Sequence, residues 1–572
     1  MPTLTWVGKD KVVNHHHEVP LRVLNKQSTF TAAAGTPENS TGNRIIHGDN
    51  LEALKSLLPE FEGRVKCIYI DPPYNTGNEG WVYNDAVNDP RILKWLGEVV
   101  GKEGDDLTRH DKWLCMMYPR LRLLHKLLAE DGAIFISIDD HELGNLLALL
   151  REIFGTGNEV ATLVWEKGKK GDSTFFSVTH EYVCVFVKNK ALLKERKVKW
   201  RHRKKGVQEV LDHYQSLRNE LGSDHAAIRL RMMAWYRQLP AKDARKAHKH
   251  YNWSDERGLY FPDNFHGPDD GRKNRPRYPI PHPVTGQPCA MPSTGWRWEE
   301  STTLAALAED PPRIHFGVDH TTIPNRKSYL FEVDQEPMMS AFYKDGRAAT
   351  LEVESILGNG VFQFPKDSDV LSELIGLVAT EPGDIVLDSF AGSGTTAHAV
   401  LKLNAQDKKD RRFILVEMME YADTLTSERV RRVMNGYGEG DRAVAGLGGS
   451  FDYYTIGDAL FVDEEQINDA VPVDAIRSYV AYAEGIPVES RAKQDNHVSP
   501  ALLGRTKDTA WFFHYSAHQE TALDFEFLSS LKVEGERPAL TIIYADKCLL
   551  SSEFLAKNNI VFKKIPRDIS RF

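Results

Sequence analysis

Short apolar runs that end at prolines or acidic residues recur along the chain. Residues 65–70 form the first run, which is rich in branched and aromatic side chains and is followed by the segment DPPY. Residues 132–140 (GAIFISIDD) and 181–188 (EYVCVFVK) have the same character. Continuous apolar runs of this length are typical of strands buried on both faces of a parallel sheet. We therefore predict a β-strand in each of the three segments.

Helical periodicity separates these strands. A helix is predicted from about residue 113 to residue 128, where apolar side chains recur every three or four positions, at Leu114, Met117, Leu121, Leu124 and Leu128. A second helical pattern covers residues 141–155, HELGNLLALLREIFG. Strands that alternate with helices predict an α/β fold with a doubly wound sheet.

The pattern changes between residues 191 and 350. Residues 191–249 are strongly charged and helix-prone, and residues 251–329 are rich in Pro, Gly, Trp and Arg. Downstream, the segments PGDIVLDSFAGSGTTAHAVLKL and RRFILVE restore the order strand, loop, helix, strand. We therefore predict that an insertion with long loops interrupts a single α/β domain.

This organisation predicts five parts of the chain. They are an N-terminal arm (1–43), a first half of the α/β domain (44–190), an inserted region (191–350), a second half (351–439) and a small C-terminal α/β accessory domain (440–572). The histidine run 15–17 is expected to lie on an exposed arm rather than to bind a metal ion.

Composition is that of a folded protein, with 41% hydrophobic and 27% charged residues. We expect a cytoplasmic protein, because no apolar run is long enough to span a bilayer and residues 9–11 interrupt any secretory pattern. The five cysteines lack paired spacing, so neither a disulfide framework nor a zinc site is expected. The net charge of −9 argues against a nucleic-acid partner, but ten Lys or Arg against one Glu in residues 188–205 offer local positive charge.

A glycine-rich turn follows the predicted strand 385–387. The strand reaches Asp388, the turn contains Gly392 and Gly394, and a helix is predicted to open at about Thr395. Glycines here let the backbone approach a ligand closely. The next strand ends at Glu417, at the spacing where an acidic residue receives a ribose diol. These features predict an adenosine-type cofactor, and by themselves they fit a nicotinamide dinucleotide, S-adenosylmethionine or a plain tight helix entry.

The segment Asp71-Pro72-Pro73-Tyr74 suits chemistry on an exocyclic amine of a base. Such an amine is a poor nucleophile because its lone pair is delocalised into the ring. A carboxylate from Asp71 and the carbonyl of Pro72 would accept its two hydrogens, and prolines hold that carbonyl rigidly. Tyr74 would offer a flat face on which an extruded base stacks. As a bare tetrapeptide the segment is also compatible with an ordinary rigid turn.

From about residue 44 to residue 434 the chain resembles the β-class amino-methyltransferases of DNA, and within them the modification (Mod) subunits of type III restriction systems. The catalytic segment precedes the glycine turn, which is the circularly permuted order that defines the β class. The segments that carry the resemblance are IIHGDNLEAL, IYIDPPYNTGN, IFISIDDHE, THEYVCVFVK, YPIPHPVTGQP, GWRWEE, FQFPKDSDVL, LDSFAGSGTTAHAV and RRFILVEMME.

The resemblance implies a permuted Rossmann-like sheet, S-adenosylmethionine as cofactor and the N6 amine of adenine as target. Members that act on cytosine N4 more often carry Ser in place of Asp71. It implies catalytic roles for Asp71, Pro72, Pro73 and Tyr74. The predicted cofactor-binding residues are Asp49, Lys366, Asp388, Phe390, Ala391, Gly392, Gly394, Thr395 and Glu417. Among these, Asp49 is expected near the cofactor adenine and Lys366 near its methionine part.

Two basic segments of the insertion are candidates for contacts with double-stranded DNA. The predicted DNA-binding residues are Lys199, Arg201, Arg203, Lys204, Arg272, Lys273, Arg275 and Arg277. Runs of charge are also found as ordinary solvated faces, and the nearby Trp296 and Trp298 are equally compatible with a packed core.

The sequence thus favours an adenine-N6 DNA methyltransferase that acts in the bacterial cytoplasm, at the nucleoid. The resemblance implies a homodimer, and either a restriction (Res) partner or solitary epigenetic methylation. The alternatives are a cytosine-N4 DNA methyltransferase and a DNA-binding subunit without catalytic activity. A protein methyltransferase of the release-factor type is disfavoured, because there the glycine turn normally comes first.

Overall fold

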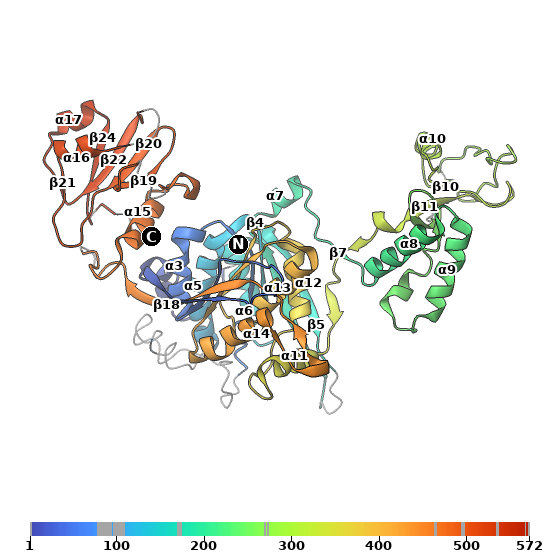
Figure 1. Cartoon of the computed structure of the whole chain (residues 1–572), viewed down its shortest axis with the longest axis horizontal. Helices are drawn as coiled ribbons and strands as arrows, with labels where there is room; N and C mark the ends of the chain where they lie inside the picture. Colours follow the sequence, from blue (N-terminus) through green and yellow to red (C-terminus); the bar gives the residue numbers. More distant parts are fainter. Residues whose placement is uncertain are drawn as a thin grey trace. The chain divides into compact units, whose positions relative to one another are not determined.

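The computed structural model describes residues 3–76, 94, 109–168, 174–267, 270, 274–462, 466–492, 498–532, 537–566, 568 and 569. The chain divides into two compact units. Met1–Val198 and Met339–Phe572 form the first, and Lys199–Met338 form the second. Figure 1 colours the chain along its sequence, so the second unit is drawn in green and yellow and the end of the first in red.

Ten strands of the first unit form one mixed sheet in the order β1-β18-β2-β15-β14-β3-β4-β6-β5-β13. The strands from β18 to β4 run parallel to one another, whereas β1, β6 and β5 add antiparallel pairs. The strands are β1 (Arg22–Thr31), β2 (Asn43–His47), β3 (Val65–Ile70), β4 (Leu128–Ile138), β5 (Glu159–Glu166), β6 (His180–Val187), β13 (Ala341–Tyr343), β14 (Ile385–Asp388), β15 (Arg412–Glu417) and β18 (Ser450–Ala459).

Both faces of the central strands are buried, as the continuous apolar runs predicted. In β3, Ile68 and Ile70 pack into a core with the flanking helices, while the alternate side chains of Cys67 and Tyr69 are also buried. Successive side chains of a strand point to opposite faces of a sheet. Layers of structure therefore cover both faces, which confirms the predicted doubly wound α/β sheet.

The helices of the first unit form two groups. Those that follow β2, β3 and β4 share one hydrophobic core, and the others surround the glycine turn. The first group is α3 (Asn50–Phe61), α5 (Arg109–Leu127) and α6 (Leu143–Phe154). The second is α11 (Gly346–Leu357), α12 (Ser368–Val378), α13 (Thr395–Asp407) and α14 (Glu428–Asn435).

The N-terminal segment is more ordered than an exposed arm. Strand β1 pairs antiparallel with β18, and the helices α1 (Lys9–Val12) and α2 (His15–Glu18) pack against α5. The side chain of His16 is buried, and burial lowers its pKa to about 3, so the ring is neutral. The expectation that the whole histidine run is exposed was therefore wrong, because the His16 side chain is buried inside the fold.

The C-terminal part begins inside the main sheet. Strand β18 pairs parallel with β2, so a boundary drawn at residue 440 from composition falls before a strand of the α/β core. Beyond it, α15 (Val473–Ala483) contacts α3, and the Arg491 guanidinium donates to the Pro59 carbonyl at 2.8 Å. A separate sheet has the strand order β19-β20-β22-β24. Its strands are β19 (Leu502–Arg505), β20 (Thr509–Phe513), β22 (Leu540–Ala545) and β24 (Ile560–Lys564). In the sequence, α16 (Phe525–Ser530) lies between β20 and β22, and α17 (Ser552–Lys557) lies between β22 and β24.

The second unit has hydrophobic cores of its own. The two helices α8 (Val207–Leu221) and α9 (His225–Gln238) pack with β8 (Trp253–Ser254) and β9 (Leu259–Asp263). Strands β10 (Ile314–His315) and β11 (Asn325–Tyr329) complete this sheet, and α10 (Glu300–Ala308) lies between β9 and β10 in the sequence. Trp296 is fully buried and its indole donates to the Tyr278 carbonyl at 2.8 Å, so it is a core residue.

Over the part of the chain that the structure describes, no helix combines the length and apolarity needed to cross a bilayer. Within the same residues, no three His, Cys, Asp or Glu side chains are grouped so as to hold a metal ion. All five cysteines are free thiols. Burial raises the pKa of Cys184 to about 12 and that of Cys115 to about 11, which makes both unreactive.

If β18 belongs to the core sheet, truncating its buried aromatic residue should destabilise the protein. Phe451→Ala removes a side chain that is 1% exposed and is expected to lower the free energy of unfolding by about 3–4 kcal/mol. Phe525→Ala is the control, since Phe525 is 65% exposed and its loss should cost below about 1 kcal/mol. Denaturant unfolding measures both, and equal losses would contradict the role of β18.

Candidate active site

The predicted site residues converge at one edge of the main sheet. Strands β2, β15, β14 and β3 are parallel neighbours, so their carboxyl ends meet at the same edge. The register pairs Leu387 with Ile68, so Asp388 is level with Tyr69, two residues before Asp71, and the turns after both strands leave the same edge of the sheet. Crevices at the carboxyl ends of such strands are where open α/β sheets bind ligands.

Asp71 has one paired and one unpaired oxygen. Its Oδ2 lies 2.6 Å from the ammonium of Lys366, which comes from the segment before α12. Its Oδ1 is buried and accepts no hydrogen bond from any described residue. A buried acceptor without a partner is costly, so this oxygen is poised to receive a donor from a ligand.

A buried carboxylate, Glu181 of β6, lies beside the half-buried Asp71 and holds its surroundings in place. Its Oε2 lies 2.6 Å from the Lys167 ammonium and 3.7 Å from that of Lys366. The hydroxyl of Tyr74 donates to the same oxygen at 3.0 Å, and the Lys366 ammonium stands 4.9 Å from the Tyr74 ring centroid. The ring of Tyr74 is thereby fixed from two sides.

The four charges of this pocket balance one another. Burial alone would raise the pKa of Glu181, but the ammonium groups of Lys366 and Lys167 outweigh it and hold that pKa below its usual range. Burial alone would lower the pKa of Lys366, but Asp71 and Glu181 outweigh it and raise that pKa. Both groups therefore stay ionised, and the positive and negative charges beside Asp71 offset one another.

The turn formed by residues 71–74 is held by α5. The indole of Trp113 donates to the Pro73 carbonyl at 2.7 Å. Asn75 adopts a left-handed φ of 60°, and its amide donates to the carboxylate of Glu142, which also pairs with His110 at 2.7 Å. Glu142 is fully buried, so these bonds are shielded from water.

The glycine turn requires the absence of side chains at two positions. A Cβ on Gly392 would lie 3.2 Å from the Phe362 ring, and a Cβ on Gly394 would lie 3.1 Å from the Thr426 carbonyl. Gly394 also has a φ of 78°, which disfavours other residues. The Thr426 hydroxyl donates to the Gly392 carbonyl at 2.6 Å and fixes the turn from outside.

Two buried carboxylates support this turn. Asp388 accepts from the Phe390 amide at 3.0 Å and from the Thr396 hydroxyl at 2.5 Å. Glu417 accepts from the Gly392 amide at 2.7 Å and from the Met419 amide at 3.0 Å. Burial raises the pKa of each to about 7, although the hydrogen bonds oppose the rise.

Asp49 lies at the same sheet edge, after β2, and caps helix α3. Its Oδ1 accepts from the amides of Leu51 and Glu52 at 2.8 and 3.2 Å. The neighbouring Asn50 donates to the Ser389 carbonyl at 3.1 Å, which links β2 to the turn after β14. The turn residues Phe390 and Ala391 precede Gly392, and Thr395 opens α13 immediately after Gly394.

The predicted DNA-binding residues belong to the second unit and differ in their pairing. Lys199 and Arg201 are exposed, with no ion-pair partner among the described residues, and Lys204 is half-buried. Arg203 pairs with Asp334 at 3.2 Å, whereas Arg275 pairs with Asp270 at 2.7 Å. The guanidinium of Arg277 is exposed and donates to the Ser293 carbonyl. Arg272 and Lys273 lie outside the described residues.

A family profile described as DNA methylase, for the N6 and N4 type, matches residues 65–428, more than half of the chain. The chain belongs to this family. Among curated relatives of this DNA methylase chain, the EcoP15I Mod subunit of a type III restriction-modification enzyme from Escherichia coli is 33% identical over 76% of the chain. The EcoPI Mod subunit from Escherichia phage P1 is 31% identical over 77%. The chain spans 66% of the length of each of these relatives.

A solved structure titled PvuII DNA methyltransferase (cytosine-N4-specific) is also similar. It aligns with 69% of this chain and 89% of its own, with a TM-score of 0.30 and 12% identity. Both the structural and the sequence likeness are low.

The sequence predicted only some of the residues that surround Asp71. Glu181 and Lys167 lie in or beside strands, and Trp113 and Glu142 lie in or before helices, far from Asp71 along the chain. One signal did exist for Glu181, because a charged residue opens an otherwise apolar strand. Such a residue must find a partner inside the fold or at its edge.

Breaking the buried ion pair should unfold the protein more easily. Lys366→Met leaves Asp71 and Glu181 short of a counter-charge and is expected to lower the free energy of unfolding by about 3 kcal/mol. The control is Lys547→Met, since Lys547 pairs with the exposed Glu520 at 2.6 Å and should cost below about 1 kcal/mol. Urea unfolding measures both variants. A similar loss of unfolding free energy in the two would argue against a stabilising role for the ion pairs of Lys366.

Proposed function

We propose that this chain is an S-adenosylmethionine-dependent methyltransferase that modifies the N6 amine of adenine in double-stranded DNA. The observation that carries the proposal is the buried, unpartnered Oδ1 of Asp71 beside the fixed ring of Tyr74. Membership of the DNA methylase family supports it, as does the likeness to type III Mod subunits.

The residues around the glycine turn fit the proposed cofactor. Gly392 and Gly394 allow the turn to pack closely against Phe362 and Thr426, and the bare glycine backbone lets a nucleoside approach it closely. Glu417 ends β15 beside this turn, and its carboxylate is the acceptor proposed for the ribose hydroxyls. S-adenosylmethionine, when bound, supplies an electrophilic methyl group on its sulfonium.

The chain's own groups prepare the amine. Asp71 accepts one amine hydrogen through Oδ1, while Lys366 holds Oδ2 and stops the carboxylate from rotating. The carbonyl of Pro72 accepts the second hydrogen, and this pairing favours a nitrogen with its lone pair free to react. Tyr74 stacks on the extruded base, with its ring kept in place by Glu181. Positioning and electrostatics thus carry the catalysis.

The second unit is the proposed DNA-recognition region. Exposed Lys199 and Arg201 suit phosphate contacts better than Arg203 or Arg275, which already pair with carboxylates. By likeness to the Mod subunits, we propose a homodimer that joins a restriction subunit or acts alone as an epigenetic methylase, at the nucleoid in the bacterial cytoplasm.

Replacing the acceptor should abolish transfer and spare binding. Asp71→Asn exchanges a carboxylate for an amide and is expected to lower methyl transfer by about a hundredfold or more. Affinity for DNA and for S-adenosylmethionine should stay within about threefold, since neither depends mainly on this oxygen. Mass spectrometry of nucleosides from treated DNA measures the product, and gel shift and calorimetry measure the binding.

The same experiment separates the alternatives. N6-methyladenine in DNA treated with the unaltered protein supports the proposal, and N4-methylcytosine would reassign the target base. DNA binding without transfer of either kind would mark a silent recognition subunit. Full activity in Asp71→Asn would remove Asp71 from the mechanism.

Cofactor affinity should depend on pH through Glu417, whose pKa burial raises to about 7. The ionised carboxylate accepts from both ribose hydroxyls, so affinity is full above about pH 8 and falls as the pH drops through the pKa. Calorimetry with S-adenosylmethionine should show weakening of roughly tenfold by about pH 6. Glu417→Gln should bind S-adenosylmethionine weakly at both pH values, and its affinity should vary little with pH. A variant with an unchanged pH profile would exclude Glu417 as the group that titrates.

A further inference from the structure

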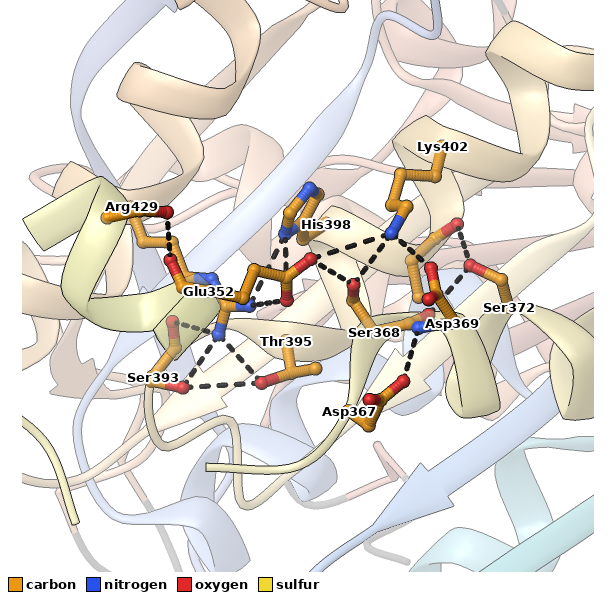
Figure 2. Close-up of polar contacts among 12 residues, drawn as sticks. Glu352, Asp367, Ser368, Asp369, Ser372, Ser393, Thr395, His398, Lys402 and Arg429 are labelled. Atoms are coloured by element: carbon orange, nitrogen blue, oxygen red, sulfur yellow. Dashed lines mark hydrogen bonds and ion pairs between the residues drawn. The ribbon is translucent and has the colours of Figure 1, made fainter. Parts of the chain in front are cut away.

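A second buried polar cluster lies against the glycine turn and has no part in the proposed chemistry. Figure 2 shows that it joins four helices, through Glu352 of α11, Ser368 of α12, His398 and Lys402 of α13, and Arg429 of α14. Arg429 is fully buried. Its two terminal nitrogens are hydrogen-bonded, whereas its buried Nε has no partner among the described residues. A buried guanidinium is costly unless partners offset its charge.

Arg429 grips the turn on both sides of Gly394. One terminal nitrogen donates to the Ser393 hydroxyl and to the Thr395 hydroxyl, both at 2.8 Å, and lies 3.4 Å from the Ser393 carbonyl. Ser393 and Thr395 flank the glycine whose left-handed φ shapes the turn. One terminal nitrogen thus holds two residues across that glycine while the other pairs with Glu352, and a single ammonium nitrogen does not reproduce this two-nitrogen arrangement.

Glu352 fixes Arg429 in turn. Its Oε2 accepts from the second terminal nitrogen at 3.1 Å, and its Oε1 accepts from the Ser368 hydroxyl at 2.7 Å and lies 3.5 Å from the Lys402 ammonium. The Nδ1 of His398 lies 3.3 Å from the same nitrogen of Arg429. Burial, aided by Arg429 and Lys402, holds the pKa of His398 well below its usual range, so the neutral ring accepts this hydrogen bond.

We propose that Arg429 is a positioning residue for the cofactor turn and that Glu352 locks its guanidinium in place. Arg429 contacts protein groups of the turn, namely two hydroxyls and a carbonyl, so it acts through Ser393 and Thr395. The inference rests on the proposed function, because S-adenosylmethionine is the ligand that the turn would hold. The cluster sets the shape of the turn before the ligand arrives, which lowers the entropy cost of binding.

The test uses the full chain and calorimetry with S-adenosylmethionine. Glu352→Gln removes the charge that pairs with Arg429 and is expected to raise the Kd roughly tenfold or more. The KM for S-adenosylmethionine should rise by a similar factor, while kcat at saturation stays within about twofold. Arg429→Lys should also raise the Kd, because one ammonium nitrogen cannot hold Ser393 and Thr395 and pair with Glu352 as two guanidinium nitrogens do.

Asp407→Asn is the matched control. Asp407 pairs with another buried guanidinium, that of Arg411, at 2.6 Å, but at the opposite end of α13 from the glycine turn. It should lower the melting temperature as Glu352→Gln does and leave the Kd unchanged. Ser393→Ala is a milder variant that keeps the charge pair, and it should raise the Kd about threefold.

The outcomes are distinct. A wild-type Kd in Glu352→Gln, or an equal loss of affinity in Asp407→Asn, would overturn the inference, because the cluster would then serve only stability. Should Glu352→Gln fail to fold, a wild-type Kd in Ser393→Ala would overturn it. If the unaltered protein binds no S-adenosylmethionine, the proposed function fails, and the inference fails with it.

Discussion

The shared buried charge between Asp71, Lys366 and Glu181 is the constraint on which the rest of the site depends. Each of these groups alone would be costly to hold away from water, and together they are stable because two carboxylates face two ammonium groups. The arrangement leaves one oxygen of Asp71 and one of Glu181 without a hydrogen bond in the described residues. The fold thereby supplies acceptors that are ready for a ligand and are held rigidly by groups the ligand does not replace.

The sheet brings this charge balance beside the glycine turn. Because β3 and β14 are adjacent and parallel, the turns that follow them lie side by side at the same edge of the sheet. The turn after β14 also contains buried carboxylates, since Asp388 and Glu417 accept backbone amides, but here burial raises their pKa values to about 7. Both halves of the site therefore rely on buried carboxylates whose hydrogen bonds set the backbone geometry.

Sequence patterns were sufficient for the central strands and for the residues at their ends. The runs 65–70 and 412–417 were found because strands buried on both faces are continuously apolar, and β3 and β15 have these bounds. Strand β1 escaped notice because it is an edge strand with mostly exposed, polar side chains, RVLNKQSTFT. Its partner β18 lies inside the sheet but was assigned to a separate domain, because only alternate residues such as Phe451 and Tyr453 are buried.

The charge partners were beyond the reach of periodicity. Lys366 was expected near the cofactor, yet its closest partner is Asp71, which lies 295 positions away in the chain. Asp388 stays a predicted cofactor-binding residue, and in the structure its two oxygens accept from the Phe390 amide and the Thr396 hydroxyl. Spacing identifies which residues follow a strand, but it carries no information on which distant side chain will neutralise them.

The pairing of β2 has a consequence for how the protein is made. Its two neighbours, β15 and β18, are translated more than 360 residues after it, and the second unit, which has its own cores, emerges in between. On the ribosome, β2 waits with both edges unpaired until nearly the whole α/β domain is available. Such long-range pairing is slow to form and leaves strand edges open to association, so the nascent chain is expected to need protection by chaperones.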